Sequence, residues 1–326
     1  MNWKMKAYLQ SAVSMLPGPA SHRIYYGIQR AIGTLRAVEP TNGFRDGLRI
    51  ADAVEAAGGR LAGATFLEVG TGRRVNVPIA LWLCGAGEII TVDRTPYLRP
   101  ELVEEELGFV RRHASEVEAL FGARADSESF RQRFAVLLRE GLTMSELLAA
   151  ARIRYLNHDV RSLPMPAGAV DHHISNNVLE HVPPPDLAAI LVEGKRIVRN
   201  DGLLVHRVDF SDHFSEDDPS ISTVNFLRYS EEEWRRFGGN RYNYHNRLRI
   251  DEFEAIVSDA GLAIVGEQPD VDRAALRLLE TGFPLDARFA GKPPVVNATA
   301  SAVVAMSPSP AGAPRMPARG VLAPVS

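Results

Sequence analysis

Cysteine is nearly absent from this sequence, because Cys84 is the only one among 326 residues. A single cysteine excludes an internal disulfide framework and a cysteine-rich zinc site, and it predicts a reducing, cytoplasmic location. Dense Lys/Arg runs are also missing and the formal net charge is −3, which disfavours nucleic acid as the main partner. The sequence lacks a Gly-x-Ser-x-Gly nucleophile elbow and a Gly-Lys-Ser/Thr phosphate loop, so hydrolase and NTPase chemistry are disfavoured.

A long hydrophobic run is missing as well. The first apolar stretch is interrupted by Gln10, Ser11 and Ser14, and it is too short for an export signal or a membrane span. Residues 1–20 instead predict an amphipathic helix. Its apolar positions are Trp3, Met5, Tyr8, Leu9, Val13 and Leu16. We expect this helix to pack on its own domain, and peripheral contact with a membrane surface is the alternative.

The chain divides by composition into three parts. Residues 1–60 predict a helical N-terminal extension, and residues 61–307 predict one α/β domain. Within that domain we expect a helical insertion at about 100–150 and an acceptor-side insertion at about 211–249. Residues 308–326 are rich in Pro and Ala, which predicts a disordered tail. The sequence is compatible with a homo-oligomer and does not specify one.

Short apolar segments alternate with helical patterns through the α/β domain. Strands are predicted at 64–70, 88–93, 153–159, 169–176 and 203–210, with closing strands at 263–268 and 298–306. A helix is predicted over 185–202, capped by Asp186 and ended by Gly202. This alternation predicts a Rossmann-like, mostly parallel sheet with helices on both faces. Ligands of such sheets bind beyond the carboxyl ends of the strands, so the residues that follow each strand matter most.

A Glu-x-Gly-x-Gly turn follows the first predicted strand. Gly70 and Gly72 allow a tight turn and a close approach of the backbone to a ligand. A dinucleotide site would want a third glycine where Val75 stands, and no carboxylate beside its pyrophosphate. Glu68 suits a ligand with a cationic end and no phosphate, such as S-adenosylmethionine. An NAD-dependent oxidoreductase is therefore the weaker alternative.

The next three strands also end in polar residues. Asp93 can accept hydrogen bonds from the vicinal hydroxyls of a ribose. Asp159 can accept from an adenine amino group, while the backbone N–H of Val160 serves a ring nitrogen. Asn176, after the fourth strand, lies where the methionine moiety and the acceptor would meet.

Taken in order, these motifs and the segment "NNVLEHV" resemble the class I S-adenosylmethionine-dependent methyltransferases. The resemblance covers roughly residues 60–270 and implies a seven-stranded sheet whose last strand is antiparallel. It implies that the first loop and Asp93 hold the methionine and ribose parts, and that Asp159 holds adenine. The family's frequent third glycine is Arg74 here. More loosely, residues 206–249 resemble methyltransferases of bacterial glycan assembly, which implies a sugar or glycan acceptor.

Methyl transfer to a hydroxyl needs a group that removes a proton as the bond forms. We expect His213 to be this base, oriented by Asp209 or Asp212, with His181 as the second candidate. A divalent metal held by Asp209, Asp212 and His213 is an alternative that is not favoured. Aromatic residues and arginines between 226 and 249 suit a polyhydroxylated acceptor, although they would also serve to pack the segment on itself. Other small N- or O-acceptors stay open.

Overall fold

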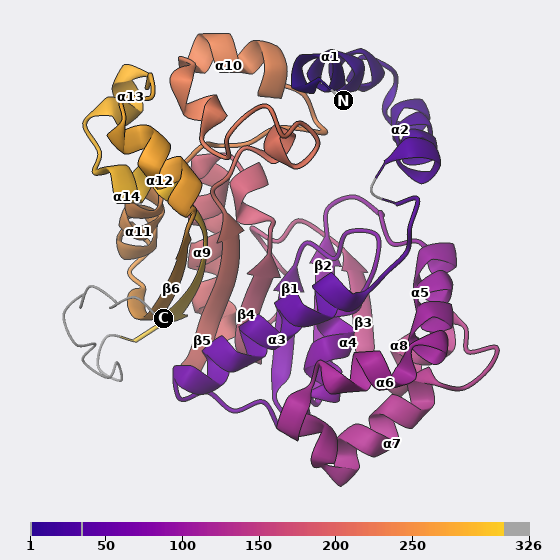
Figure 1. Ribbon diagram of the computed structural model, residues 1–326. Coiled ribbons are helices and arrows are strands. Elements are labelled where there is room, and N and C mark those ends of the chain that lie inside the picture. Colours follow the sequence, from indigo (N-terminus) through magenta and orange to yellow (C-terminus); the bar gives the residue numbers. More distant parts are fainter. Residues whose placement is uncertain (1, 34, 310–326) are drawn as a thin grey trace.

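The computed structural model describes residues 2–33 and 35–309 (Figure 1). Most of the predicted C-terminal tail, from residue 310 onward, therefore lies outside the described residues. Among the residues that are described, no helix is long and apolar enough to cross a membrane.

Seven strands form one sheet in the order β3-β2-β1-β4-β5-β7-β6. Their bounds are β1 (Thr65–Val69), β2 (Glu88–Asp93), β3 (Ile153–Asn157), β4 (Val170–Asn176), β5 (Val198–Asp209), β6 (Ala263–Val271) and β7 (Thr299–Ser307). Strands β1 to β5 pair in parallel, and β7 runs antiparallel to both β5 and β6. The predicted sheet, with its antiparallel last strand, is confirmed.

Helices cover both faces of the sheet (Figure 1). They are α1 (Trp3–Ser14), α2 (Gly18–Ile32), α3 (Thr41–Ala56), α4 (Asn76–Leu83), α5 (Pro100–Arg112), α6 (Ala114–Ala119), α7 (Glu128–Leu137), α8 (Met144–Ala150), α9 (Pro184–Ile197), α10 (Glu231–Gly238), α11 (Ile250–Asp259), α12 (Arg273–Glu280), α13 (Ala287–Ala290) and α14 (Pro294–Ala298). One core lies between the sheet and α3, α4, α5 and α7, and a second lies between the sheet and α9 and α11. The central strands are buried on both faces, as expected for a parallel sheet.

The helix predicted over 185–202 is shorter than expected. It ends at Ile197, because Val198 pairs with Val170 and begins β5. The residue before the helix is Pro183, so the predicted cap is also wrong. The carboxylate of Asp186 lies in the first turn and accepts a hydrogen bond from Arg161 at 2.6 Å.

The segment after β5 folds around aromatic residues contributed by both ends of the chain. Trp3 of α1 packs against Phe214 and Trp234, with ring centroids 5.4 and 6.3 Å apart. The helix α10 begins with a Ser230–Glu233 capping box. This third cluster holds α1 at the end of the sheet where the parallel strands end (Figure 1).

Candidate active site

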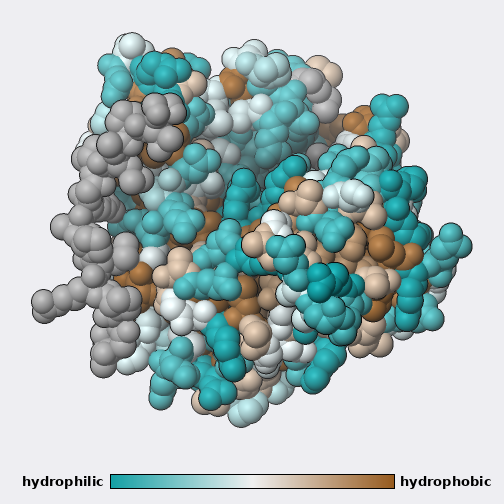
Figure 2. Space-filling view, turned by 60° about the horizontal axis from the view of Figure 1, so that its bottom comes forward, coloured by the Kyte–Doolittle hydropathy of each residue, from teal (hydrophilic) through white to brown (hydrophobic). Residues whose placement is uncertain are grey.

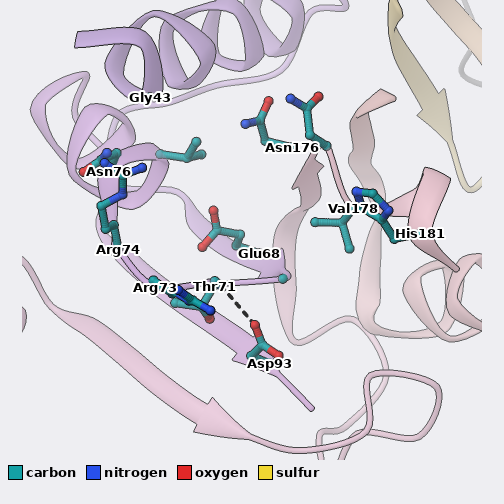
Figure 3. Close-up of a pocket in the computed structure, with 14 residues that line it drawn as sticks. Gly43, Glu68, Thr71, Arg73, Arg74, Asn76, Asp93, Asn176, Val178 and His181 are labelled. Carbon is teal, nitrogen blue, oxygen red and sulfur yellow. Dashed lines mark hydrogen bonds between the residues drawn. The ribbon is translucent and has the colours of Figure 1, made fainter. Parts of the chain in front are cut away.

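A pocket of about 390 Å³ opens at the carboxyl ends of β1, β2 and β4 (Figure 3). Its lining residues are Gly43, Glu68, Gly70, Thr71, Gly72, Arg73, Arg74, Asn76, Val77, Asp93, Asn176, Asn177, Val178 and His181. Six of the residues named from the sequence meet here, although they come from separate loops. Parallel strands bring their carboxyl ends to one edge of the sheet, which is why these loops converge.

The turn after β1 depends on two glycines in the left-handed region. Gly70 has φ +84° and Gly72 has φ +64°. A Cβ at position 70 would lie 2.4 Å from Cγ2 of Val178, so the close approach of this loop to β4 requires glycine. The backbone N–H of Gly72 donates to Asp93 at 3.0 Å, which ties the turn to the end of β2 (Figure 3).

Glu68 lies at the floor of the pocket and is only 4% exposed. Its carboxylate accepts a hydrogen bond from the hydroxyl of Thr91, which in turn contacts the hydroxyl of Thr71 at 2.6 Å. Burial raises the pKa of Glu68 to about 8, and the hydrogen bond from Thr91 offsets this only in part. A cationic ligand in the pocket would favour the charged carboxylate.

Asp93 closes the opposite wall. Besides Gly72, its carboxylate accepts from the backbone N–H of Thr95 at 3.0 Å. Burial raises the pKa of Asp93, while these backbone donors oppose the shift. A carboxylate has about four acceptor positions, so capacity remains for hydroxyl donors from a ligand.

Arg74 occupies the position of the third glycine and points to the side of the loop. It pairs with the buried Glu106 of α5 at 3.0 Å, and Asn76 donates to the same oxygen at 2.9 Å. Burial raises the pKa of Glu106 to about 7, against the attraction of Arg74. The helix α5 therefore anchors the glycine loop, a role that no residue spacing in the sequence indicates.

Several lining residues were missed by sequence reasoning. Gly43 belongs to α3, which precedes the first strand and carries no recognisable ligand motif. Asn177 has φ +52° and accepts a hydrogen bond from Arg207 of β5. Its neighbour Asn176 donates to Asp46 of α3 at 3.2 Å. Asn177 itself was not missed, since the sequence places it with Asn176 after the fourth strand, where the methionine moiety and the acceptor would meet.

His181 lies at the far end of the pocket, in the short helical turn after β4 (Figure 3). Its Nδ1 contacts the carbonyl oxygen of Tyr244 at 2.7 Å. Because a carbonyl oxygen only accepts, Nδ1 carries the proton and Nε2 of the neutral ring is free to accept one. Burial and the nearby His213 lower the pKa of His181, so the ring is neutral at pH 7.

His213 lies behind His181, with ring centroids 5.0 Å apart. Its Nε2 is 3.6 Å from the carboxylate of Asp209. Burial opposes the charged ring, but Asp209 and Glu180 outweigh it and raise the pKa of His213 to about 9. The pKa of Asp209 is lowered despite its burial, chiefly by His213. His213 is therefore cationic at neutral pH and unsuited to accept a proton.

Three residues of this region could hold a metal ion. Glu180, His181 and His213 each offer one ligand atom, and these atoms all lie within 4.8 Å of one another. Glu180 is fully buried, and burial raises its pKa to about 8. Asp209 flanks the set through His213, whereas Asp212 does not join it. The carboxylate of Asp212 accepts from the backbone of Phe214 and the side chain of Asn225, so it organises its own loop.

The two residues predicted to contact adenine do not line the pocket. The carboxylate of Asp159 is bound by Arg161, and these hydrogen bonds lower the pKa of Asp159 to about 2. Val160 packs against the apolar core beside α9. The side chain of Asp159 is 37% exposed, and its contact with adenine stays a prediction.

Two of the six arginines in the acceptor-side insertion are buried and structural. Arg249 is buried and donates to the carbonyl oxygens of Phe210, Asn297 and Thr299. Arg247 is also buried, and its donors include a pair with Glu231 at 2.7 Å. Arg247 and Arg249 therefore cannot serve a sugar-binding surface without losing bonds within the fold, whereas Arg228 and Arg241 are exposed.

Comparisons with known proteins give one family match and distant structural likenesses. A methyltransferase domain family matches residues 132–206, from α7 into β5. A Bacillus halodurans C-125 protein described as a methyltransferase is 11% identical, with a TM-score of 0.42, covering 79% of this chain and 98% of that chain. The geranyl diphosphate C-methyltransferase of Streptomyces coelicolor A3(2) is 12% identical, with a TM-score of 0.45, covering 80% and 76%. A comparison with curated proteins gives no significant match.

The sheet order with its antiparallel β7 is the one that the resemblance to class I S-adenosylmethionine-dependent methyltransferases implies, and the segment matched by the methyltransferase domain family lies within this sheet and its helices. The predicted fold class and enzyme class are thus confirmed. S-adenosylmethionine is the cofactor of this class, as the sequence predicts.

Proposed function

We propose that the protein transfers the methyl group of S-adenosylmethionine to a hydroxyl of a sugar or glycan-type acceptor. The observation that carries the proposal is the acidic pocket at the strand ends, where Glu68 and Asp93 face one cavity. Glu68 has no cationic partner among the described residues, and because burial raises its pKa to about 8, a cation that enters the pocket would favour its charged form. Glycine at position 70 lets the loop approach a ligand closely.

The pocket residues fit the cofactor part by part. S-adenosylmethionine, when bound, supplies a methyl group on a cationic sulfonium. Glu68 and the turn at Gly70 and Gly72 would hold its methionine end, and Asp93 would accept from its ribose hydroxyls. Asn176 and Asn177 line the side of the pocket that leads to His181, where we place the acceptor.

His181 is the general base of this proposal, in place of His213. Its Nε2 is free because Nδ1 is held by Tyr244, and the ring is neutral at pH 7. The proton of the acceptor hydroxyl passes to Nε2 of His181 as the hydroxyl oxygen bonds to the methyl carbon. The carboxylate of Asp209, which faces His213, offsets part of the positive charge that then forms on the histidine pair.

The choice of a hydroxylated acceptor rests on the polar character of this end of the pocket and on the resemblance of residues 206–249 to glycan-modifying enzymes. The test is calorimetric titration with S-adenosylmethionine and with NAD, followed by a screen of sugar nucleotides and glycans for S-adenosylhomocysteine release. We expect binding of S-adenosylmethionine alone and release with a hydroxylated sugar. Binding of NAD instead, or release only with amine or carbon acceptors, would contradict the proposal.

A further inference from the structure

The two N-terminal helices carry most of the apolar surface that the fold leaves uncovered. Ten large hydrophobic side chains are exposed among the described residues, and seven of them lie between residues 5 and 32. These are Met5, Tyr8, Leu9, Met15, Leu16, Ile24 and Ile32, and Met15 and Ile32 are 86% and 71% exposed. Apolar side chains gathered in this way mark an interaction surface.

The helix α1 is apolar on two sides. Trp3, Ala7 and Val13 form its buried side, and Trp3 and Ala7 pack on the segment after β5. Met5, Tyr8 and Leu9 lie at helical spacing on the other side, Met15 and Leu16 follow the end of the helix at Ser14, and all five are exposed. The buried side already holds α1 in place, so the fold alone does not explain the second side.

The helix α2 continues this surface. Ile24, Ile28 and Ile32 are spaced four residues apart and therefore lie along one line of the helix. Between α1 and α2 runs a groove of about 100 Å³, lined by apolar side chains that include Leu9 and Ile28. The two helices thus form one continuous apolar surface, which we call the α1–α2 hairpin surface (residues 3–32).

The charge of this segment is opposite to that of the rest of the chain. Residues 1–38 contain five Lys or Arg and no Asp or Glu, although the whole chain has a formal net charge of −3. Lys4 and Arg23 are exposed and have no carboxylate partner among the described residues. An apolar helical surface bordered by unpaired cations suits the interface of an anionic lipid bilayer.

The position of the hairpin relates it to the pocket. On α2, Gln29 accepts a hydrogen bond from Arg73, and the ring of Tyr26 lies 5.0 Å from the same guanidinium. The helices lie at the end of the sheet where the parallel strands end (Figure 1). The face brought forward in Figure 2 is mainly hydrophilic, with apolar residues scattered over it. The apolar surface is therefore on the side of the molecule that holds the active site.

We propose that the α1–α2 hairpin surface docks onto an anionic lipid surface. Exposed apolar side chains such as Met15 and Ile32 enter the interfacial region, and Lys4 and Arg23 face the lipid phosphates. A second copy of the chain is a poorer occupant, because a symmetric contact would bring ten cations together without a single acidic residue of these segments between them. Docking does not depend on the identity of the methyl acceptor.

The test is cosedimentation of the full chain with vesicles. We expect binding to vesicles of phosphatidylcholine with 30% phosphatidylglycerol to exceed binding to pure phosphatidylcholine by at least about tenfold at 0.1 M NaCl. Each cation near an anionic surface contributes about a fivefold change in partitioning. Raising the salt to 0.5 M should remove most of this difference, because screening weakens attraction to the headgroups.

Two double variants separate the contribution of the apolar side chains to vesicle binding from that of the cations. Met15→Ser with Ile32→Ser, and Lys4→Glu with Arg23→Glu, should each lower vesicle binding by at least about tenfold. Their matched controls are Val192→Ser with Val295→Ser, which are exposed apolar residues elsewhere, and Arg139→Glu with Arg154→Glu. The controls should bind within twofold of the parent chain.

Failure of the parent chain to bind anionic vesicles would overturn the proposal. Equal losses in the variants and their controls would also overturn it, since binding would then not depend on the hairpin. If light scattering shows a dimer that Met15→Ser with Ile32→Ser dissolves, while vesicles bind nothing, the surface is a self-association interface instead. Binding of S-adenosylmethionine, measured in parallel, shows whether each variant is folded and leaves the methyltransferase proposal to its own test.

Discussion

Glu68 and Asp93 are acidic residues at neighbouring strand ends, but they differ in the hydrogen-bond donors that support the charged form. Glu68 has one hydroxyl donor and is fully buried, so its pKa rises to about 8. Asp93 has backbone donors from Gly72 and Thr95 that support the charged form against burial. Asp93 is therefore a fixed acceptor for a ligand, whereas the charge of Glu68 depends on what occupies the pocket.

Asp93→Asn should weaken binding of S-adenosylmethionine by at least about tenfold, because an amide cannot accept from ribose hydroxyls and backbone donors as the carboxylate does. Isothermal titration of the purified chain measures the change. Asp259→Asn, at an exposed position on α11, is the control and should leave the affinity unchanged. Equal affinities for the parent and Asp93→Asn would remove Asp93 from the ribose site.

His181→Gln should lower turnover by about a hundredfold, since general base catalysis contributes on that order. Affinity for S-adenosylmethionine should stay within twofold, because His181 lies at the acceptor end of the pocket. Release of S-adenosylhomocysteine measures turnover, and His113→Gln, at the residue between α5 and α6, is the control. A His213→Gln variant with the larger loss, while His181→Gln stays active, would restore His213 as the base.

Chelation tests the set formed by Glu180, His181 and His213. Dialysis against EDTA should leave turnover within twofold, because Asp209 holds His213 in its protonated form and a protonated ring cannot bind a metal. Elemental analysis of the dialysed chain accompanies the assay. Loss of activity that a divalent metal restores would show that these three residues hold a catalytic ion.

At the scale of elements, close contacts between helices set the positions of the loops around the pocket. The helices α3 and α4 touch at Gly47, where a Cβ would lie 2.5 Å from Cβ of Ala80. This contact brings Gly43 of α3 to the pocket and 2.6 Å, measured from an added Cβ, from the side chain of Asn76. A helix that precedes the first strand thereby becomes part of the site.

Gly47→Ala should lower the free energy of unfolding by about 1–3 kcal/mol, because the added methyl group overpacks the contact between α3 and α4. Gly27→Ala is the matched control, since it also lies inside a helix but meets nothing within 4 Å. It should raise stability by about 0.5–1 kcal/mol. Urea unfolding of both variants measures the difference, and an unchanged midpoint for Gly47→Ala would contradict the close packing.

At the scale of the whole molecule, buried titratable groups make stability depend on pH. The folded chain keeps a proton on Glu68 up to pH of about 8, whereas the unfolded chain releases it near pH 4.5. The free energy of unfolding of the ligand-free protein should therefore fall as the pH rises from 6.5 to 8, by at most about 1.4 kcal/mol per pH unit for this group. Urea titrations at several pH values should show a shallower fall in Glu68→Gln.

Below pH 6.5 the buried histidines give stability the opposite dependence on pH. Burial lowers the pKa of His173 to about 4 and that of His206 well below its usual value, so the unfolded chain binds protons that the folded chain does not. The contribution of these histidines to stability should then be lost as the pH is lowered through 6.5. A stability that keeps rising from pH 6.5 to pH 8 would contradict the Glu68 assignment, and equal pH dependence below 6.5 in a His173→Gln variant would contradict the His173 assignment.

Much of the fold follows from local sequence patterns. Alternating apolar segments and helical periods identify the strands, because burial between two layers of helices leaves only apolar runs as central strands. Gly70, Gly72 and Asp93 could be assigned to the pocket from the sequence, since they directly follow or end predicted parallel strands, and such strands end at one edge of the sheet. The early end of α9 could not be predicted from the sequence, because Val198 joins β5 only through its pairing with Val170.

What the sequence alone determined is the fold class, the cofactor and the first loop, since each depends on residues close together in the chain. The tertiary structure decided which groups distant in sequence contact one another, and these contacts set their protonation and burial. Asp209 and Glu180 make His213 cationic and leave His181 to act as the base. Burial of Arg249 and the apolar surface of α1 and α2 likewise depend on what packs against each side chain, which no local pattern contains.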